Sequence, residues 1–271
     1  MGLYGRYVVP FLINASMRSK EVTAQRTEVV PRARGRVLEV GIGSGLNLPF
    51  YGPEVTELDG VDPSPELLRH ARRRATAAQF PVRLHAESAE RLPFPDGTFD
   101  TAVMTWTLCS IPDPEAALRE VRRVLRPAGR LLFVEHGRSP EPAVATWQRR
   151  IEPVWRRVSG GCHLTRRVDE LIRAAGFQVD SLAIAYLAGP RVFTFRYQGD
   201  ARASPGRPRG LKAYAPRPIP WRGRPTVPRD GRRGPRSRAG WKSDPSPRRA
   251  PLNTAPTSRR RSASESCPSP S

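Results

Sequence analysis

The sequence predicts an α/β fold in which a mostly parallel sheet carries helices on both faces. The aliphatic run 37–40 has the composition of a short buried strand, and three glycines follow it at Gly41, Gly43 and Gly45. A second strand ends at Asp62, and strand-like and helical segments alternate beyond it. Such alternation is typical of parallel strands that are joined by crossover helices.

The first elements of this sheet can be placed in order along the chain. Strands are expected at 36–40, 57–61, 81–85, 101–107 and 130–135. Helices are expected directly after Asn47 and at 65–76 and 114–126. Pro65 suits the first turn of one helix, whereas Pro127 and Gly129 stop the other. Because ligands of such sheets bind at the carboxyl ends of the strands, the segments that follow these strands should share one rim.

The remaining segments complete the expected domain. Apolar residues at helical spacing predict a helix at 143–158, and Thr165 is placed as the N-cap of a helix that ends at Ala175. Two strands at 179–186 and 192–197 flank a Gly-Pro turn, which predicts a closing hairpin. Residues 1–34 are expected to form a helical N-terminal cap, and the α/β domain is expected to span 35–200.

The glycine turn and the acid after the second strand predict a nucleoside site. Glycines can take positive φ and let a ligand approach the backbone, and Asp62 is placed to accept from ribose hydroxyls. Dinucleotide folds usually carry G-x-G-x-x-G with a helix N-terminus that faces a pyrophosphate. Here the spacing is G-x-G-x-G and Glu39 precedes it. An acid at this position repels a pyrophosphate and suits a ligand that carries an ammonium group.

At this point the sequence resembles the class I S-adenosylmethionine-dependent methyltransferases, whose first motif has this form. The segment 89–100, A-E-R-L-P-F-P-D-G-T-F-D, is similar to the family's segment between the third and fourth strands. The resemblance covers nearly all of the first two hundred residues. It implies a Rossmann-like, seven-stranded, mostly parallel sheet with an antiparallel last strand, and S-adenosyl-L-methionine as the cofactor.

The resemblance also assigns the cofactor-binding residues. Glu39 is expected to face the methionine end of the cofactor, and Asp62 is expected to bind the ribose. The family often has an acid where this chain has Ser88, so the adenine is expected to be bound by Ser88 and the backbone of Ala89. The full set of expected contacts is Glu39, Gly41, Gly43, Gly45, Asn47, Asp62, Pro63, Ser88, Ala89 and Thr105.

Three segments resemble, more narrowly, the methyltransferase-like 7 group and its bacterial relatives with a type 11 methyltransferase domain. They are 107–110 (T-L-C-S), 134–136 (V-E-H) and 160–166 (G-G-C-H-L-T-R). Animal members of that group methylate thiols, so the resemblance implies a small, thiol or lipid-like methyl acceptor. His163 and His136 are candidate catalytic bases because imidazole titrates near neutral pH, and helix-capping roles are the alternative for both. Cys162 is interpreted as a buried structural thiol.

The segment 201–271 differs in composition from the rest of the chain. It holds 18 Lys and Arg, three acids and 14 of the 30 prolines, and so carries most of the chain's net charge of +21. Without apolar periodicity it is expected to be a disordered basic tail that contacts polyanions non-specifically. An RNA-associated methyltransferase that uses this tail is one alternative function, and a mis-called gene end is an alternative explanation of the tail.

The remaining features limit the class of protein. The three cysteines form no C-x-x-C pair and the four histidines are scattered, so the sequence predicts neither a disulfide framework nor a metal site. No run has the length of a transmembrane helix, and we expect a cytoplasmic protein. The apolar run 8–13 is expected to close over the acceptor pocket or to touch a membrane. A nucleotide-dependent dehydrogenase is disfavoured by Glu39, the glycine spacing and the final hairpin.

Overall fold

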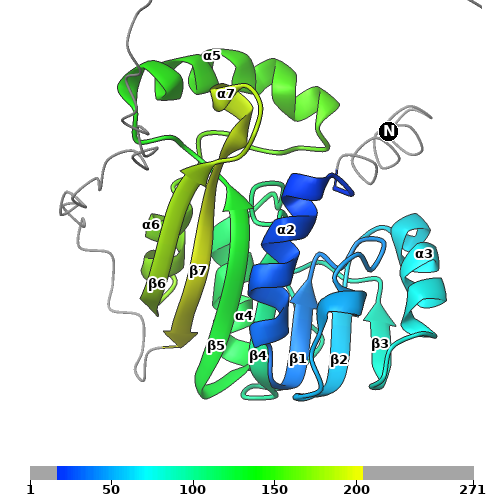
Figure 1. The fold of residues 1–271 in the computed structure, drawn as a ribbon. Coiled ribbons are helices and arrows are strands. Elements are labelled where there is room, and N and C mark those ends of the chain that lie inside the picture. Colours follow the sequence, from blue (N-terminus) through cyan, green and yellow to red (C-terminus); the bar gives the residue numbers. More distant parts are fainter. Residues whose placement is uncertain (1–16, 204–271) are drawn as a thin grey trace, which may run out of the picture. The chain divides into compact units, whose positions relative to one another are not determined.

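The computed structural model describes residues 17–203, and the predictions for 8–13 and for the tail beyond Ala203 lie outside these residues. The core is a seven-stranded sheet in the order β3-β2-β1-β4-β5-β7-β6 (Figure 1). The strands are β1 Gly35–Val40, β2 Val55–Val61, β3 Val82–His85, β4 Phe99–Thr105, β5 Leu125–His136, β6 Phe177–Tyr186 and β7 Phe195–Ala203. β7 runs antiparallel to both β5 and β6, and the pairs among β1 to β5 are parallel. The predicted mostly parallel sheet with an antiparallel last strand is therefore confirmed.

Helices cover both faces of the sheet (Figure 1). They are α2 Lys20–Val29, α3 Pro65–Ala75, α4 Pro114–Val124, α5 Pro142–Val158, α6 Val168–Ala174 and α7 Arg191–Thr194, with 3-10 turns η2 Val30–Arg32 and η3 Leu48–Phe50. The starts of α3 and α4 are fixed by side-chain caps, because Ser64 accepts from the amide of Leu67 and Asp113 accepts from that of Ala116. Within residues 17–203, none of the helices has the length and apolar composition needed to cross a bilayer.

The alternation of side chains along the central strands divides the core into two layers. Leu38 of β1 packs in a cluster with Leu118 of α4, on one face of the sheet. The neighbouring Val37 points the other way and packs with Val29 of α2 and Leu68 of α3. Because both faces of the central strands are buried, these strands are apolar along their length. The helix α2 lies within the segment 1–34 that was expected to form a helical N-terminal cap.

Three element predictions need correction. The helix expected after Asn47 is only the 3-10 turn Leu48–Phe50, because the Gly-Pro pair at 52–53 prevents its extension. Thr165 is not an N-cap: α6 begins at Val168 and the Thr165 amide donates to Glu152 Oε2 at 2.8 Å.

The third correction concerns the last strand. Residues 192–194, expected in this strand, belong to the short helix α7. β7 begins at Phe195 and pairs with β5 and β6 up to Ala203, three residues past the expected domain end at 200.

Candidate cofactor and acceptor site

A cavity of about 850 Å³ lies at the carboxyl ends of β1, β2, β4 and β5. Its lining contains nine of the ten residues expected to bind the cofactor, namely Glu39, Gly41, Gly43, Asn47, Asp62, Pro63, Ser88, Ala89 and Thr105. His136 also lines it. Gly45 and His163 are not among the lining residues.

The three glycines of the turn after β1 differ in what surrounds them. All three have positive φ, at +71° for Gly41, +54° for Gly43 and +78° for Gly45. A Cβ on Gly45 would lie 2.9 Å from Leu48 Cδ1 and 3.2 Å from Ala71 Cα, so this glycine permits close packing against α3. A Cβ on Gly43 would meet nothing closer than 3.9 Å. Gly43 therefore keeps part of the cavity open to a ligand.

Asp62 is held by the backbone of the turn that it faces. Its Oδ2 accepts from the amide of Gly43 at 3.0 Å, and its Oδ1 accepts from the amide of Ser64 at 2.9 Å. Burial raises the pKa of Asp62 above its ordinary value, and these two hydrogen bonds oppose that shift. A carboxylate oxygen can accept two hydrogen bonds. Each oxygen of Asp62 therefore keeps an acceptor position for a pair of neighbouring hydroxyls.

Glu39 is the centre of a buried polar network. Its Oε1 accepts from Asn47 Nδ2 at 2.9 Å, and its Oε2 accepts from the hydroxyl of Tyr51 at 2.8 Å. Asn47 Nδ2 also contacts Thr105 Oγ1, and Asn47 Oδ1 accepts from Arg26 Nε of α2, both at 2.9 Å. Burial raises the pKa of Glu39 to about 7, although its hydrogen bonds and Arg26 lower it. The sequence indicated Glu39 and Asn47 but not Arg26 or Tyr51.

The loop after β3 forms the third part of the lining. The Ser88 hydroxyl donates to the Glu90 carboxylate, whose Oε1 accepts from the amide of Asp113 at 3.0 Å. Glu87 also lines the cavity and was not predicted as a site residue. Members of the family often have an acid at the position of Ser88, and this chain has its acid one residue earlier, at Glu87.

The loop after β4 is fixed by a buried carboxylate. Trp106 has φ +59°, a left-handed conformation that is rare for a bulky residue and turns the chain sharply. Glu135, fully buried on β5, then accepts from the amides of Thr107 and Leu108 at 2.9 Å and from that of Cys109 at 3.2 Å. Burial raises the pKa of Glu135 to about 7 against these three bonds. The loop is thereby held rigidly at the cavity wall.

Three side chains of types that can bind a metal ion meet at this wall. The sulfur of Cys162 lies 3.7 Å from His136 Nδ1, and the ligand atoms of Cys109, His136 and Cys162 all lie within 4.8 Å of one another. Both cysteines are buried, and all three residues line the cavity. The sequence expectation of no metal site rested on spacing along the chain, which does not reveal that these three segments converge.

His163 is placed differently from His136. Its Nδ1 lies 3.0 Å from Glu152 Oε1, and Glu152 also binds the amide of Thr165. Burial lowers the pKa of His163 below its ordinary value. The His136 ring packs edge-on against Trp106, with ring centroids 4.5 Å apart, and reaches the cavity. The geometry therefore favours His136 over His163 as a group that can contact an acceptor.

Apolar side chains form the end of the cavity beyond the cysteines. They come from the β4 loop, from α5 and from the segment between β6 and β7: Trp106, Ile111, Trp155, Val158, Leu187 and Phe193. The cavity thus joins a polar end, built on β1 and β2, to an apolar end. Its volume lies in the upper part of the range of about 300–1,000 Å³ that is usual for ligand sites.

Comparison with known proteins identifies the family. Residues 38–133 match the model of a methyltransferase domain. The chain is 33% identical over 185 residues to the human thiol S-methyltransferase TMT1B, covering 64% of this chain and 75% of the human protein. The chain belongs to the S-adenosylmethionine-dependent methyltransferases.

The matches to two other relatives span a smaller share of those proteins, less than two thirds of their length. The match to rat TMT1B is 37% identical and spans 59% of the rat protein and 52% of this chain. The match to the phosphatidylethanolamine N-methyltransferase of Cereibacter sphaeroides is 41% identical and spans 58% of that protein and 43% of this chain. A solved S-adenosylmethionine-dependent methyltransferase from Methanosarcina mazei shares the fold, with a TM-score of 0.52 and 23% identity over 64% of this chain and 94% of its own.

The residues at the polar end of the cavity fit the family's cofactor, S-adenosyl-L-methionine. Asp62 offers two acceptor oxygens to a ribose diol, and the open space above Gly43 lets the ligand reach the backbone. Glu39 lines the same part of the cavity, and a methionine ammonium bound beside it would favour the ionised form of this buried carboxyl. The cofactor, when bound, supplies an electrophilic methyl group on a sulfonium.

Proposed function

We propose that this methyltransferase transfers the methyl group to the sulfur of a small, apolar thiol. The observation that carries the proposal is the shape of the cavity, in which one space joins the cofactor residues to an apolar end that contains His136. A donor and an acceptor bound there would be held next to each other without intervening water. The names of the mammalian relatives, which are thiol S-methyltransferases, support a sulfur acceptor.

The roles of the protein's residues follow from the chemistry of methyl transfer. Displacement at a sulfonium produces a neutral leaving group, so the protein needs no acid to stabilise that group. It needs to orient donor and acceptor and to remove the proton of a thiol. Asp62 and Glu39 orient the donor. His136, which reaches the cavity next to Trp106, is placed to take the thiol proton.

A substrate panel tests this proposal directly. Purified full-length protein would be assayed with labelled cofactor on alkyl and aryl thiols and on the matched alcohols, which differ only at the acceptor atom. We expect methylation of the thiols and none of the alcohols. Ile111→Asp, which places a charge in the apolar end, should raise KM for apolar thiols and leave cofactor affinity unchanged. Transfer to phosphatidylethanolamine and not to any thiol would show that the acceptor is a lipid amine.

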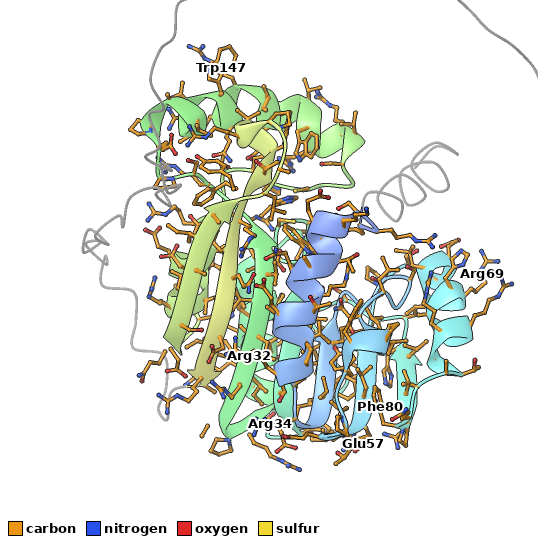
Figure 2. The ribbon with its side chains drawn as sticks, in the orientation of Figure 1. Arg32, Arg34, Glu57, Arg69, Phe80 and Trp147 are labelled. Atoms are coloured by element: carbon orange, nitrogen blue, oxygen red, sulfur yellow. The ribbon has the colours of Figure 1, made fainter. Side chains whose placement is uncertain are left out.

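A lipid acceptor is the second candidate, because one face of α5 is both apolar and basic. Trp147, Val154 and Val158 are exposed by 55%, 62% and 48%, and Figure 2 shows Trp147 pointing away from the sheet. Arg150 lies over the Trp147 ring, with its guanidinium carbon 5.4 Å from the ring centroid. An exposed apolar and cationic helix face is suited to an anionic membrane surface. Val158 also lines the cavity, so such a surface would lie beside its entrance.

Vesicle binding tests this second candidate. Sedimentation with anionic vesicles should fall strongly for Trp147→Glu, and it should be unaffected by Gln79→Glu, which adds the same charge at an exposed position outside α5. Equal sedimentation of the Trp147→Glu variant and the unmodified protein would exclude a membrane role for this face.

A further inference from the structure

We propose that Cys109, His136 and Cys162 bind one Zn²⁺ ion, whose fourth coordination position opens into the acceptor end of the cavity. The three residues come from three separate segments: the loop after β4, the end of β5 and the loop after α5. Two buried thiols and an imidazole are ligands that favour zinc among the common divalent ions.

The spacing of the three ligand atoms matches a zinc ion. With Zn–S bonds of about 2.3 Å and a Zn–N bond of about 2.0–2.1 Å, tetrahedral geometry places sulfur and nitrogen about 3.6 Å apart and two sulfurs about 3.8 Å apart. The measured distance from Cys162 Sγ to His136 Nδ1 is 3.7 Å, and no pair of the three atoms is separated by more than 4.8 Å. Movements of about 1 Å or less would close the site around the ion.

The surroundings of the cluster hold two of the ligands in place. The Glu135 carboxylate accepts from the amide of Cys109 and from the amides of the two residues before it, Thr107 and Leu108. Cys162 precedes His163, whose amide donates to the Cys109 carbonyl at 2.8 Å. The two cysteine loops are therefore tied to each other by the backbone. Two thiolates and a neutral imidazole balance the charge of Zn²⁺, so the loaded site adds no net charge to a buried position.

An open fourth position gives the ion a chemical role. Sites with three protein ligands and one open position are typical of catalytic zinc, and all three residues line the cavity. In the zinc-loaded site His136 is a ligand and does not act as the base, so a thiol that binds the ion loses its proton to solvent and is held as a thiolate. Its sulfur then forms the new S–CH₃ bond while the donor's S–CH₃ bond breaks, with the electron pair remaining on the donor's sulfur. The neutral thioether product is a weak zinc ligand and can leave. This role rests on the proposed function, whereas the zinc site itself does not.

Metal analysis of the full-length protein tests the site without any assay of activity. Protein that is purified under reducing conditions and dialysed against limiting Zn²⁺ should retain about one zinc per chain. Cys109→Ser, Cys162→Ser and His136→Gln should each lose it. Cys267→Ser, which changes the only other cysteine of the sequence, should retain it. Thermal midpoints equal to that of the metal-free unmodified protein, together with unchanged cofactor affinity, would establish that the three variants are folded. Zinc at well below one equivalent, or equal zinc in all four variants, would overturn the proposal.

Cobalt substitution tests the open position. Co²⁺ in the site should give thiolate charge-transfer absorption and the intense visible bands of a four-coordinate ion. Benzyl mercaptan should shift these bands, and benzyl alcohol should not. Insensitivity to the thiol would refute the open position. If metal-free protein methylates thiols at the full rate, the role of zinc is wrong but the proposed function stands. If the cobalt spectrum responds and no thiol is methylated, the site is supported and the proposed function fails.

Discussion

The buried carboxyl of Glu39 should make cofactor binding dependent on pH. Burial raises its pKa to about 7, so the free protein is a mixture of protonated and ionised Glu39 near neutral pH. A ligand that carries an ammonium and a sulfonium binds the ionised form more tightly, since the protonated carboxyl offers it no charge. Binding should therefore release a proton from Glu39.

The size of this effect follows from the pKa. A group with a pKa of about 7 is ionised in about one-eleventh of molecules at pH 6 and in about ten-elevenths at pH 8. If only the ionised form binds, cofactor affinity rises about tenfold over this range, equivalent to about 1.4 kcal/mol. Glu39→Gln keeps the size of the side chain and an oxygen that can accept from Asn47 Nδ2. It should bind the cofactor more weakly at pH 8, and its affinity should be nearly independent of pH.

Titration calorimetry at pH 6, 7 and 8, in buffers of different ionisation enthalpy, measures both the affinity and the protons released. Methylthioadenosine is the matched control ligand, because it keeps the nucleoside and lacks the charged amino-acid group. Its affinity should vary little with pH in both proteins. An equal pH dependence for the unmodified protein and Glu39→Gln, or proton uptake on binding, would refute the assignment of Glu39 to the cationic end.

Four further predictions follow from the structure. Asp62→Ala removes charge-assisted hydrogen bonds worth about 1.5–3 kcal/mol each, so calorimetry should show cofactor binding weakened about tenfold or more in a folded protein. Gly43→Ala, at φ +54°, should cost about 1 kcal/mol of stability in urea unfolding and should lower cofactor affinity much more. A chain that ends at Ala203 should keep its thermal midpoint and elute from heparin at lower salt. Burial raises the pKa values of Glu39 and Glu135, so the cofactor-free protein should lose stability as pH rises from about 4.5 to about 7. The loss should be at most about 3 kcal/mol for each group. Urea unfolding at pH 5 and pH 8 should show that Glu39→Gln removes the contribution of Glu39.

Local patterns in the sequence were sufficient for most of the sheet. The strands are apolar because both of their faces are buried, and the turn at Gly41 requires residues that tolerate positive φ. Element ends were less predictable where a tertiary contact decides them. α6 starts after Thr165 because the amide of Thr165 is bound by Glu152 on another helix. Spacing along the chain contains no sign of that contact.

In the polar part of the site, too, local sequence predicts some features and tertiary contacts decide the others. The position of Glu39 and Asp62 at the rim could be predicted, because Glu39 is the last residue but one of β1 and Asp62 directly follows β2. The partners that set the properties of Glu39 could not, because Arg26 reaches it through Asn47 only after α2 has packed across the sheet. The raised pKa of Glu39 is therefore a property of the packed domain, although the residue is recognisable in the motif.

The cluster at the acceptor end is the clearest case of a site that spacing conceals. Cys109, His136 and Cys162 each stand in a short motif that the sequence indicated separately. Their convergence depends on the parallel pairing of β4 with β5, which brings the ends of both strands to one rim, and on α5 returning the chain to that rim. Metal motifs read from sequence require ligands a few residues apart on one turn or hairpin. A parallel sheet instead gathers ligands from successive strand ends, so a site of this kind becomes visible only when the order of the strands is known.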